Sequence, residues 1–328
     1  MKLSDLGEFG LIERIRQAVA PTPGVVVGIG DDCAVLDLPP GERLLTSTDL
    51  LLEEVHFRRC WTDPYQLGRK SVSVNVSDIA AMGGIPRHLY LGLAVPADFT
   101  VADLDAFIAG FLAACSDYGT VLVGGDTCRS PGPLLISVTV EGTVADRELI
   151  RRYGACPGDG VYVSGTLGDS ALALRQLQSG VTPPAELARR HHDPRARVEL
   201  GRALAAARIP SAMIDISDGL LADLGHILEA SAVGAELEEA TLPLSAVLKA
   251  EVAKDPDRIE LALAGGEDYE LLFTVPPQQQ AGLVELAGAV GVPLTRIGVV
   301  TSAATGLMVH PGAGRCGRPV TAGFDHFR

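Results

Sequence analysis

The sequence predicts a two-domain protein in which helices and strands alternate in both halves. A chain of 328 residues exceeds the length of one typical domain. Its composition, 47% hydrophobic and 21% charged, is rich enough in apolar residues to fill two cores. A charged and then turn-rich stretch over 145–158 marks the expected boundary. The domains are therefore expected at 1–148 and 149–328.

Hydrophobic periodicity and the Gly and Pro residues at segment ends define the elements of the first half. The clearest is a helix over 101–118, because Leu104, Phe107 and Phe111 lie on one stripe. The other elements, in order, are a helix over 4–20, strands at 25–36 and 43–49, a helix over 64–82, and strands at 88–95, 121–123 and 134–140. The strand at 121–123 is expected to run into a Gly124-Gly125-Asp126 turn.

The second half restarts the alternation after the boundary. Its expected elements are a strand at 161–164, helices from about 169 and over 195–207, a strand at 213–216, a helix to about 230, a strand at 271–275, a helix over 278–290, and strands at 296–301 and 307–310. The segments Asn75–Ile79 and Asp215–Gly219 share a polar, β-branched, Ser, Asp pattern. This echo predicts two related acidic turns around one cleft, or is a chance match.

Charge and composition restrict the partners. The net charge of −14 argues against a nucleic-acid partner, since backbone binding needs clustered Lys and Arg. No signal-peptide pattern or membrane-spanning apolar run is evident, so no membrane partner and a cytoplasmic location are expected. The six cysteines form no C-x-x-C pair and are expected to be small buried hydrophobes.

Five short aspartate motifs are the strongest functional signal. They are Gly30-Asp31-Asp32, Ser47-Thr48-Asp49, Asn75-Val76-Ser77-Asp78, Gly124-Gly125-Asp126 and Asp215-Ile216-Ser217-Asp218. If the carboxylates converge they repel, because two like charges about 4 Å apart cost about 4 kcal/mol at an effective dielectric near 20. A fold that gathers them needs cations. Oxygen ligands without a matching Cys/His set indicate Mg²⁺, which usually accompanies phosphate.

Other motifs are absent or misleading. The sequence has no Gly-Lys-[Ser/Thr] P-loop and no protein-kinase His-Arg-Asp or Asp-Phe-Gly. The Gly312–Gly317 segment fits G-x-G-x-x-G, but the context predicts a hairpin turn. His191 and His192 are interpreted as a solvated helix end.

Taken in order along the chain, the aspartate motifs and several others resemble the thiamine-monophosphate kinase family, in the superfamily typified by aminoimidazole ribonucleotide synthetase. The additional motifs are Gly7-Glu8-Phe9, Val55-His56-Phe57, Ser164–Ser170, Gly265–Glu270 and Phe324-Asp325-His326-Phe327. The resemblance implies an N-terminal α+β domain that forms a β-barrel with a second copy in a homodimer. It also implies a C-terminal α/β domain and an ATP cleft between the two domains.

The implied reaction is Mg²⁺-assisted transfer of the γ-phosphoryl group of ATP to thiamine monophosphate, giving thiamine diphosphate. By resemblance, several Mg²⁺ ions are held by Asp32, Ser47, Thr48, Asp49, Asp78, Asp126 and Asp215, with Asp218 for a further ion. The implied ATP contacts are Gly125, Asp126, Arg152 and Ser217, with Arg151 an alternative to Arg152. The implied substrate contacts are His56 for the phosphate and Glu267 and Phe324 for the thiamine part.

Each of these residues also has a purely structural interpretation. A single Asp is most often a turn or cap residue, His56 a satisfied histidine beside Phe57, and Phe324 a core residue. No residue is assigned as a general base, because the acceptor is already a phosphate oxygen, and direct in-line transfer is expected.

Two other function classes stay open. One is a sister ATP-dependent synthetase acting on a purine intermediate, although Val55-His56-Phe57 and Gly265–Tyr269 fit it poorly. A selenide-using or a hydrogenase-maturation relative should carry a reactive Cys near the N-terminus or at the C-terminus, and residues 1–30 and 326–328 contain none. The second class is a non-catalytic acidic metal-binding protein.

Overall fold

The computed structural model describes residues 13–20, 22–27, 35–311 and 318–319. The chain divides into two compact units, Met1–Ile79 with Gly84–Arg147, and Ala80–Gly83 with Glu148–Arg328. Each unit has a sheet packed with helices, so the fold is a two-domain α+β fold. Within the described ranges, none of the helices combines the length and the apolar character that crossing a bilayer requires.

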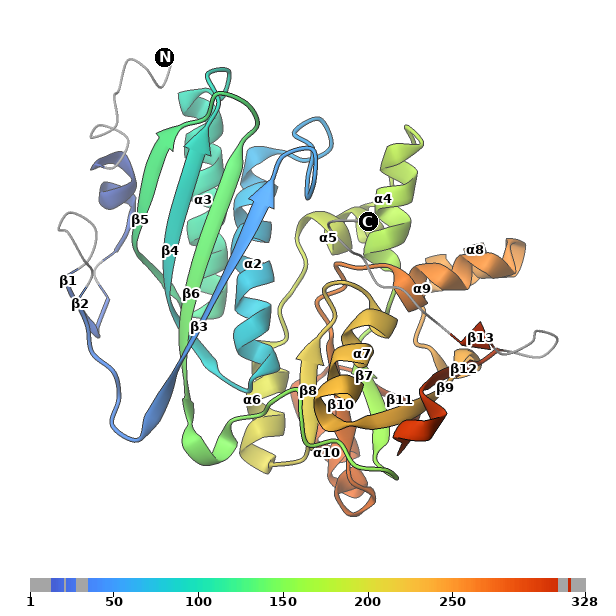
Figure 1. Cartoon of the computed structure of the whole chain (residues 1–328). Coiled ribbons are helices and arrows are strands. Elements are labelled where there is room, and N and C mark those ends of the chain that lie inside the picture. Colours follow the sequence, from blue (N-terminus) through green and yellow to red (C-terminus); the bar gives the residue numbers. More distant parts are fainter. Residues whose placement is uncertain (1–12, 21, 28–34, 312–317, 320–328) are drawn as a thin grey trace. The chain divides into compact units, whose positions relative to one another are not determined.

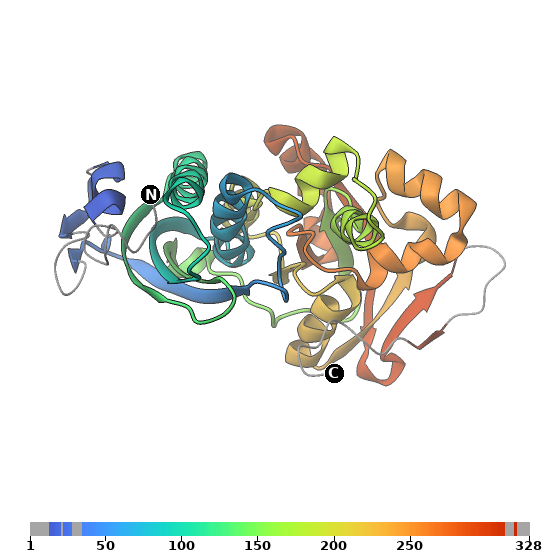
Figure 2. The ribbon, with the colours of Figure 1, turned by 90° about the horizontal axis from the view of Figure 1, so that it is seen from above.

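The N-terminal unit is built on one open four-stranded sheet in the order β3-β6-β4-β5. These strands are β3 (Glu42–Leu52), β4 (Ile85–Val95), β5 (Val121–Arg129) and β6 (Leu135–Ala145). Helices α2 (Pro64–Ala81) and α3 (Val101–Tyr118) cover the same face of the sheet (Figures 1 and 2). Residues 13–18 are helical, and β1 (Val25–Val27) and β2 (Val35–Leu36) form a separate antiparallel pair. In the described part of this one chain the sheet does not close into a barrel.

Local sequence signals fix helix α3 and its contact with α2. Thr100 caps the first turn in a capping box with Asp103, and Gly119 ends the helix with φ of 66°. A Cβ added at Gly110 would lie 1.9 Å from the Tyr65 carbonyl oxygen of α2. Only glycine therefore allows the two helices to approach this closely.

The C-terminal unit has a seven-stranded sheet in the order β13-β12-β9-β11-β7-β10-β8. Its strands are β7 (Gly160–Ser164), β8 (Ala212–Asp215), β9 (Val233–Glu238), β10 (Leu271–Val275), β11 (Leu294–Ser302), β12 (Leu307–His310) and β13 (Arg318–Pro319). Its helices are α4 (Asp169–Gln178), α5 (Ala185–His192), α6 (Val198–Ala207), α7 (Leu220–Ser231), α8 (Ala246–Lys254), α9 (Glu260–Ala264) and α10 (Gln280–Val290). Short 3₁₀ turns lie at Asp146–Glu148, Glu239–Thr241, Pro256–Ile259, Pro277–Gln279 and Ala303–Thr305.

This sheet differs from the expected α/β class. Among its described strands only β9 and β12 pair in parallel, and the other pairs are antiparallel. The unit is therefore α+β. Alternation of strands and helices in the sequence does not determine strand direction, because a helix can connect antiparallel strands as well as parallel ones.

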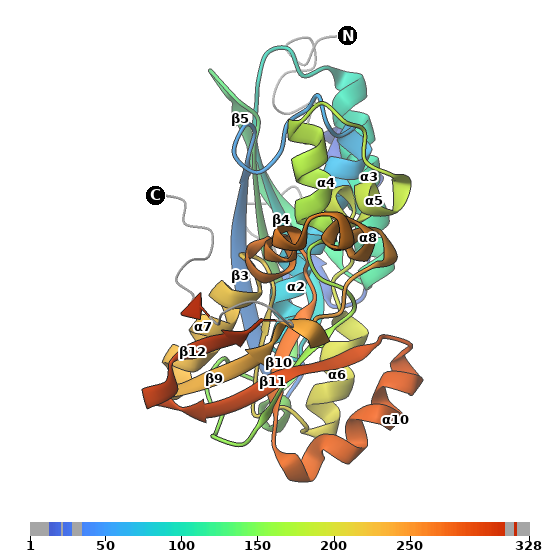
Figure 3. The same cartoon turned by 90° about the vertical axis from the view of Figure 1, so that its right-hand side faces the viewer.

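Both faces of the C-terminal sheet are buried, which explains the continuous apolar sequence of β10. Leu271, Phe273 and Val275 belong to one hydrophobic cluster together with residues of α6 and α10. Leu272 belongs to a second cluster together with residues of α7 and α9. Successive residues of a strand point to opposite faces, so the helices form layers on the two sides of the sheet (Figure 3).

Several sequence predictions are wrong in detail. Gly124-Gly125-Asp126 is not a turn, because β5 continues through it to Arg129. The echoed segments differ in structure, since Asn75–Ile79 lies entirely within α2 whereas Asp215–Gly219 is the end of β8 and the loop after it. Three cysteines expected to be buried, Cys60, Cys128 and Cys156, are exposed; Cys115 is buried as expected. The segment 312–317 lies outside the described residues.

Candidate active site

Three of the predicted metal-binding residues of the N-terminal unit lie together where β3 packs on α2. The Ser47 hydroxyl on β3 donates to Asp78 Oδ2 on α2 over 2.5 Å. The backbone N–H of Asp49 donates to the side-chain oxygen of Asn75 on the same helix over 3.1 Å. Hydroxyl and carboxylate oxygens are the donors that Mg²⁺ prefers, so Ser47, Asp49 and Asp78 fit that ion.

Thr48 lies between Ser47 and Asp49 but faces the other side of the sheet. Successive residues of a strand alternate in direction, and the Thr48 hydroxyl lies 2.8 Å from the Thr139 hydroxyl of β6. The side chain of Thr48 is therefore separated from the other three by the sheet itself.

Asp126 and Gly125 lie on the opposite edge strand. Across the sheet, Asp126 of β5 lies opposite Gly92 of β4, Gly92 lies opposite Ser137 of β6, and Ser137 lies opposite Leu50 of β3. Three strand spacings correspond to roughly 14 Å between β3 and β5. Asp126 is exposed, and its carboxylate accepts a hydrogen bond from the Thr127 N–H over 2.9 Å. Within a single N-terminal sheet, Asp126 and Asp49 are therefore too far apart to bind the same ion.

His56 lies in the tight turn after β3, with defined hydrogen bonding. Its Nδ1 accepts the backbone N–H of Leu52 over 3.0 Å. A nitrogen that accepts cannot carry the proton, so the neutral ring carries it on Nε2. His56 is half-buried and precedes the buried Phe57.

In the C-terminal unit, Asp215, Ser217 and Asp218 follow one another from the end of β8 to the start of α7. Asp215 is 3% exposed. The carboxylate of Asp223, in the first turn of α7, accepts the backbone N–H groups of Ser217, Asp218 and Gly219, each over 3.1 Å. The Ser217 carbonyl accepts the N–H of Glu267 over 2.7 Å. Since both backbone groups of Ser217 are engaged, its hydroxyl is the group suited to a ligand.

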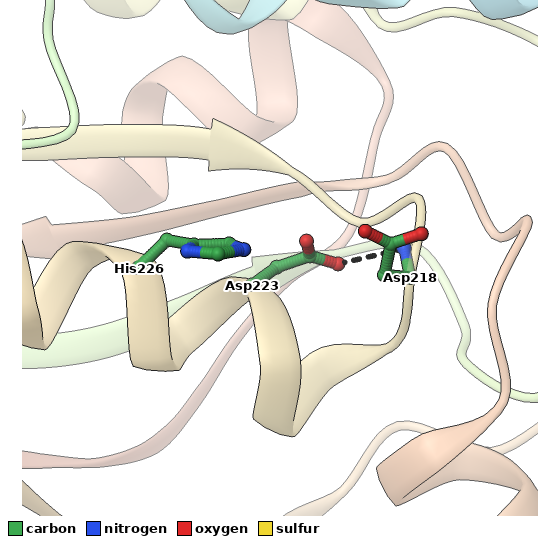
Figure 4. A group of neighbouring side chains, drawn as sticks. All are labelled: Asp218, Asp223 and His226. Carbon is green, nitrogen blue, oxygen red and sulfur yellow. Dashed lines mark hydrogen bonds between the residues drawn. The ribbon is translucent and has the colours of Figure 1, made fainter. Parts of the chain in front are cut away.

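Asp218, Asp223 and His226 form a group that sequence reasoning missed, apart from Asp218 itself (Figure 4). One ligand atom from each lies within 4.8 Å of the others, so together they could hold a cation. Burial, with a smaller effect of the Asp218 charge, raises the pKa of Asp223 to about 7. The spacing Asp-x4-Asp-x2-His was the available sequence signal, because positions three apart share one face of a helix.

The segment Gly265–Glu270 packs against the Asp215–Gly219 loop. Besides the contact of Glu267 with Ser217, the Tyr269 N–H donates to the Ile216 carbonyl over 2.9 Å. A Cβ at Gly266 would lie 2.4 Å from the Ser217 carbonyl oxygen, which requires glycine there. Glu267 and Tyr269 have φ of 66° and 50°. Such values are strained for non-glycine residues and cluster at functional sites.

Buried charges hold this segment. Glu270 is fully buried and accepts hydrogen bonds from Arg197 Nε over 2.7 Å and from the Ser164 hydroxyl over 2.5 Å, and Arg190 lies 3.0 Å away. Asp268, 2% exposed, accepts the Gly168 N–H over 2.8 Å. His191 and His192, predicted to be solvated, are 4% and 7% exposed, so that prediction is wrong. Polar partners make their burial possible, and such partners leave no periodic signal in the sequence.

Asp268 should make stability depend on pH. Burial raises the pKa of its carboxyl from 3.8 to about 8, although the Arg190 charge opposes the shift. A raised folded-state pKa favours the protonated form, so this contribution to the free energy of unfolding is complete below about pH 4 and is lost as the pH rises towards 8. Asp268→Asn, which keeps an acceptor for the Gly168 N–H, should reduce the dependence of the free energy of unfolding on pH in this range. Urea unfolding of both proteins from pH 5 to pH 9 checks it; parallel profiles would contradict it.

The remaining predicted residues are placed as follows. Arg152 is exposed in the segment before β7. Its neighbour Arg151 stacks on the Tyr153 ring at 5.5 Å and accepts the Met213 N–H through its carbonyl. Asp32 and Phe324 lie outside the described residues.

The chain matches family models over both units and a curated relative over nearly its whole length. The models of the N-terminal and C-terminal domains of AIR synthase related proteins match residues 30–144 and 156–310. Thiamine-monophosphate kinase of Salmonella typhimurium is 42% identical over 330 residues, covering 98% of each chain. The chain belongs to the thiamine-monophosphate kinase family.

Solved structures of the thiamine-monophosphate kinase family resemble this fold over nearly the whole chain. The enzyme of Stenotrophomonas maltophilia K279a has a TM-score of 0.82 and 41% identity, covering 93% of this chain and 96% of its own. AaThiL complexed with AMPPCP and TMP has a TM-score of 0.74 and 37% identity, covering 94% and 95%. Family membership therefore extends over both units.

Proposed function

We propose that this protein transfers the γ-phosphoryl group of ATP to thiamine monophosphate, giving thiamine diphosphate and ADP, the last step of thiamine diphosphate synthesis. The observation that carries the proposal is 42% identity to a thiamine-monophosphate kinase over 98% of both chains. The related AaThiL complex with AMPPCP and TMP supports ATP as co-substrate and a monophosphate as acceptor.

Mg²⁺ would be held by oxygen donors from both units. Ser47, Asp49 and Asp78 fit it best, since they are oxygen donors that already contact one another or one helix. Asp32, Asp126, Asp215 and Asp218 complete the proposed set. The Thr48 hydroxyl was also predicted to bind Mg²⁺, but it faces the other side of the sheet and is left out of the ion site formed by Ser47, Asp49 and Asp78. When bound there, Mg²⁺ supplies positive charge that offsets the charge of the phosphates.

The protein's other groups bind and orient the two substrates. Gly125, Asp126, Arg152 and the Ser217 hydroxyl are proposed for ATP. His56, whose Nε2 carries the proton, donates to the phosphate of thiamine monophosphate. Glu267 and Phe324 bind the thiamine part. No residue is proposed as general base. A phosphate oxygen of the acceptor attacks the γ-phosphorus in line and ADP leaves, because positioning and charge compensation are the main requirements of this reaction.

The proposal includes a homodimer. The N-terminal sheet has two edge strands, β3 and β5, and Leu44 and Leu50, which alternate with the helix-facing residues of β3, are 52% and 55% exposed. Two such sheets together supply eight strands, the number at which side chains fill a barrel interior. A second copy would also offer its own Asp126, which one sheet keeps away from Asp49. Sedimentation equilibrium tests the dimer.

Domain roles and location complete the proposal. Residues 1–148 are assigned to ATP and Mg²⁺ binding and residues 149–328 to the second synthetase-like domain, with ATP in a cleft between them. The reaction is assigned to the cytoplasm, where ATP is available.

An ADP-release assay with ATP and Mg²⁺ tests the function. Thiamine monophosphate is compared with free thiamine and with the substrate of aminoimidazole ribonucleotide synthetase. Turnover with thiamine monophosphate alone supports the proposal. Turnover only with the purine-pathway substrate would replace it by the sister activity, and metal binding without any turnover would favour a non-catalytic role.

A further inference from the structure

His191 lies in the last turn of helix α5, in a buried position beside Glu267. Its Nδ1 lies 3.2 Å from Glu267 Oε2, an ion-pair distance, and 2.9 Å from the Ser170 hydroxyl of α4. The His191 side chain is 5% exposed and the Glu267 side chain 24%. The imidazole is thus inside the protein, whereas part of the carboxylate can be reached by a ligand.

The two oxygens around Nδ1 determine where the proton lies. If Nδ1 carried a lone pair, the Ser170 hydroxyl could donate to it, but the Glu267 carboxylate would face that lone pair at 3.2 Å. If Nδ1 carries the proton, both oxygens face a donor. An ionised Glu267 therefore selects the ring with a proton on Nδ1, and that N–H points between Ser170 and Glu267.

The backbone of Glu267 is held separately from its side chain. Its N–H is bound by the Ser217 carbonyl over 2.7 Å, and its φ of 66° is strained. Arg190, which precedes His191 on α5, lies 3.0 Å from Glu270 and donates to the Thr166 carbonyl over 2.9 Å. The end of α5 therefore contacts the Gly265–Glu270 segment through two successive side chains, one of which reaches Glu267.

We propose that His191 is a positioning residue that orients the Glu267 carboxylate toward the thiamine part of the substrate. The inference rests on the proposed function, in which Glu267 binds that part. Holding one carboxylate oxygen from inside directs the other toward the amino group or the cationic ring of thiamine. A carboxylate fixed in advance loses less conformational freedom when the substrate binds.

The test uses the full-length protein and three variants. His191→Leu removes the N–H at similar volume, His191→Asn restores a donor near the position of Nδ1, and His192→Leu removes an equally buried imidazole from the next position. KM for thiamine monophosphate, KM for ATP, kcat and the midpoint of thermal unfolding are measured for each. We expect His191→Leu to raise KM for thiamine monophosphate about 10-fold, the scale of one charge-assisted hydrogen bond, with KM for ATP unchanged.

Rescue and controls decide between positioning and a structural role. His191→Asn should recover most of the lost affinity, and His192→Leu should lower the unfolding midpoint without a selective change in KM. An unchanged KM for thiamine monophosphate in folded His191→Leu, or equal changes in both KM values, would overturn the inference alone. Absence of turnover in the wild-type protein would instead overturn the proposed function, and with it the substrate role of His191.

Discussion

Asp78→Asn is expected to lower kcat/KM for thiamine monophosphate by at least about 100-fold at saturating Mg²⁺, the scale on which removing one electrostatic contact to a transition state acts. The substitution keeps the shape of the side chain but removes its charge and one of its two oxygens. Asp78 Oδ2 also accepts the Ser47 hydroxyl over 2.5 Å, so the change disturbs two oxygen donors of the proposed metal set. Coupled ADP-release kinetics across a range of Mg²⁺ concentrations measures the effect.

A matched substitution distinguishes the metal role from a general loss of acidity. Asp117 lies on α3 of the same unit, with 59% of its side chain exposed and an ion pair to Arg69. Asp117→Asn removes the same charge from an exposed helix surface and should leave the kinetics near those of the wild type. If Asp78→Asn retained activity similar to that of Asp117→Asn, Asp78 would have no part in the reaction.

Elements with a strong local signal could be predicted from the sequence. The helix at 101–118 agrees with α3, Val101–Tyr118, because its stripe, its capping box and its terminal glycine all act within one segment. Strand β9 and helices α8 and α9 were missed, and of helix α5 only its end at His191 and His192 was predicted. Helix α5 ends in the polar run Arg189–His192, in which only the two histidines are buried. The partner of His191 is the Glu267 carboxylate, which is distant in the sequence and leaves no periodic signal.

Glycine motifs were the hardest to interpret. Gly124-Gly125-Asp126 resembles a turn in sequence, but Gly125 allows β5 to lie against β4, where a Cβ would be 1.9 Å from the Leu91 carbonyl oxygen. The pairing shift between Leu89 and Tyr90 shows that the glycines accompany a bulge. The composition of a glycine-rich segment does not distinguish close strand packing from a turn.

The candidate site could be predicted in kind but not in arrangement. The oxygen-rich motifs led to Ser47, Asp49 and Asp78. The structure joins the Ser47 hydroxyl to the Asp78 carboxylate and holds the Asp49 backbone N–H on Asn75 of the same helix. Which residues of β3 face the helices depends on the register of the strand, and this register turns Thr48 to the other face. The separation of Asp126 from Asp49 follows from the order of the strands in the sheet. Arg197 was missed and His191 was wrongly predicted to be solvated, because each supports another residue through a long-range contact. Asp223 was missed although the backbone groups it holds lie only four to six positions away.

The second large effect concerns stability. Arg197→Met should lower the free energy of unfolding by about 3 kcal/mol, the lower end of the cost of breaking a buried ion pair. Glu270 is fully buried and would lose its Arg197 hydrogen bonds. Arg190 at 3.0 Å and the Ser164 hydroxyl at 2.5 Å remain and keep the cost at that lower end. Urea unfolding followed by circular dichroism measures the change.

An exposed ion pair and a double variant serve as controls for the stability loss expected of Arg197→Met. Arg43 and Asp146 form an ion pair with 63% and 64% of their side chains exposed, so Arg43→Met should change stability little. In Arg197→Met combined with Glu270→Gln, the uncompensated charge is removed together with its partner. The double variant should therefore lose less stability than the sum of the two single variants. If Arg197→Met were no more destabilising than Arg43→Met, or if the two single effects simply added, the buried charge of Glu270 would not be what holds the Gly265–Glu270 segment in place.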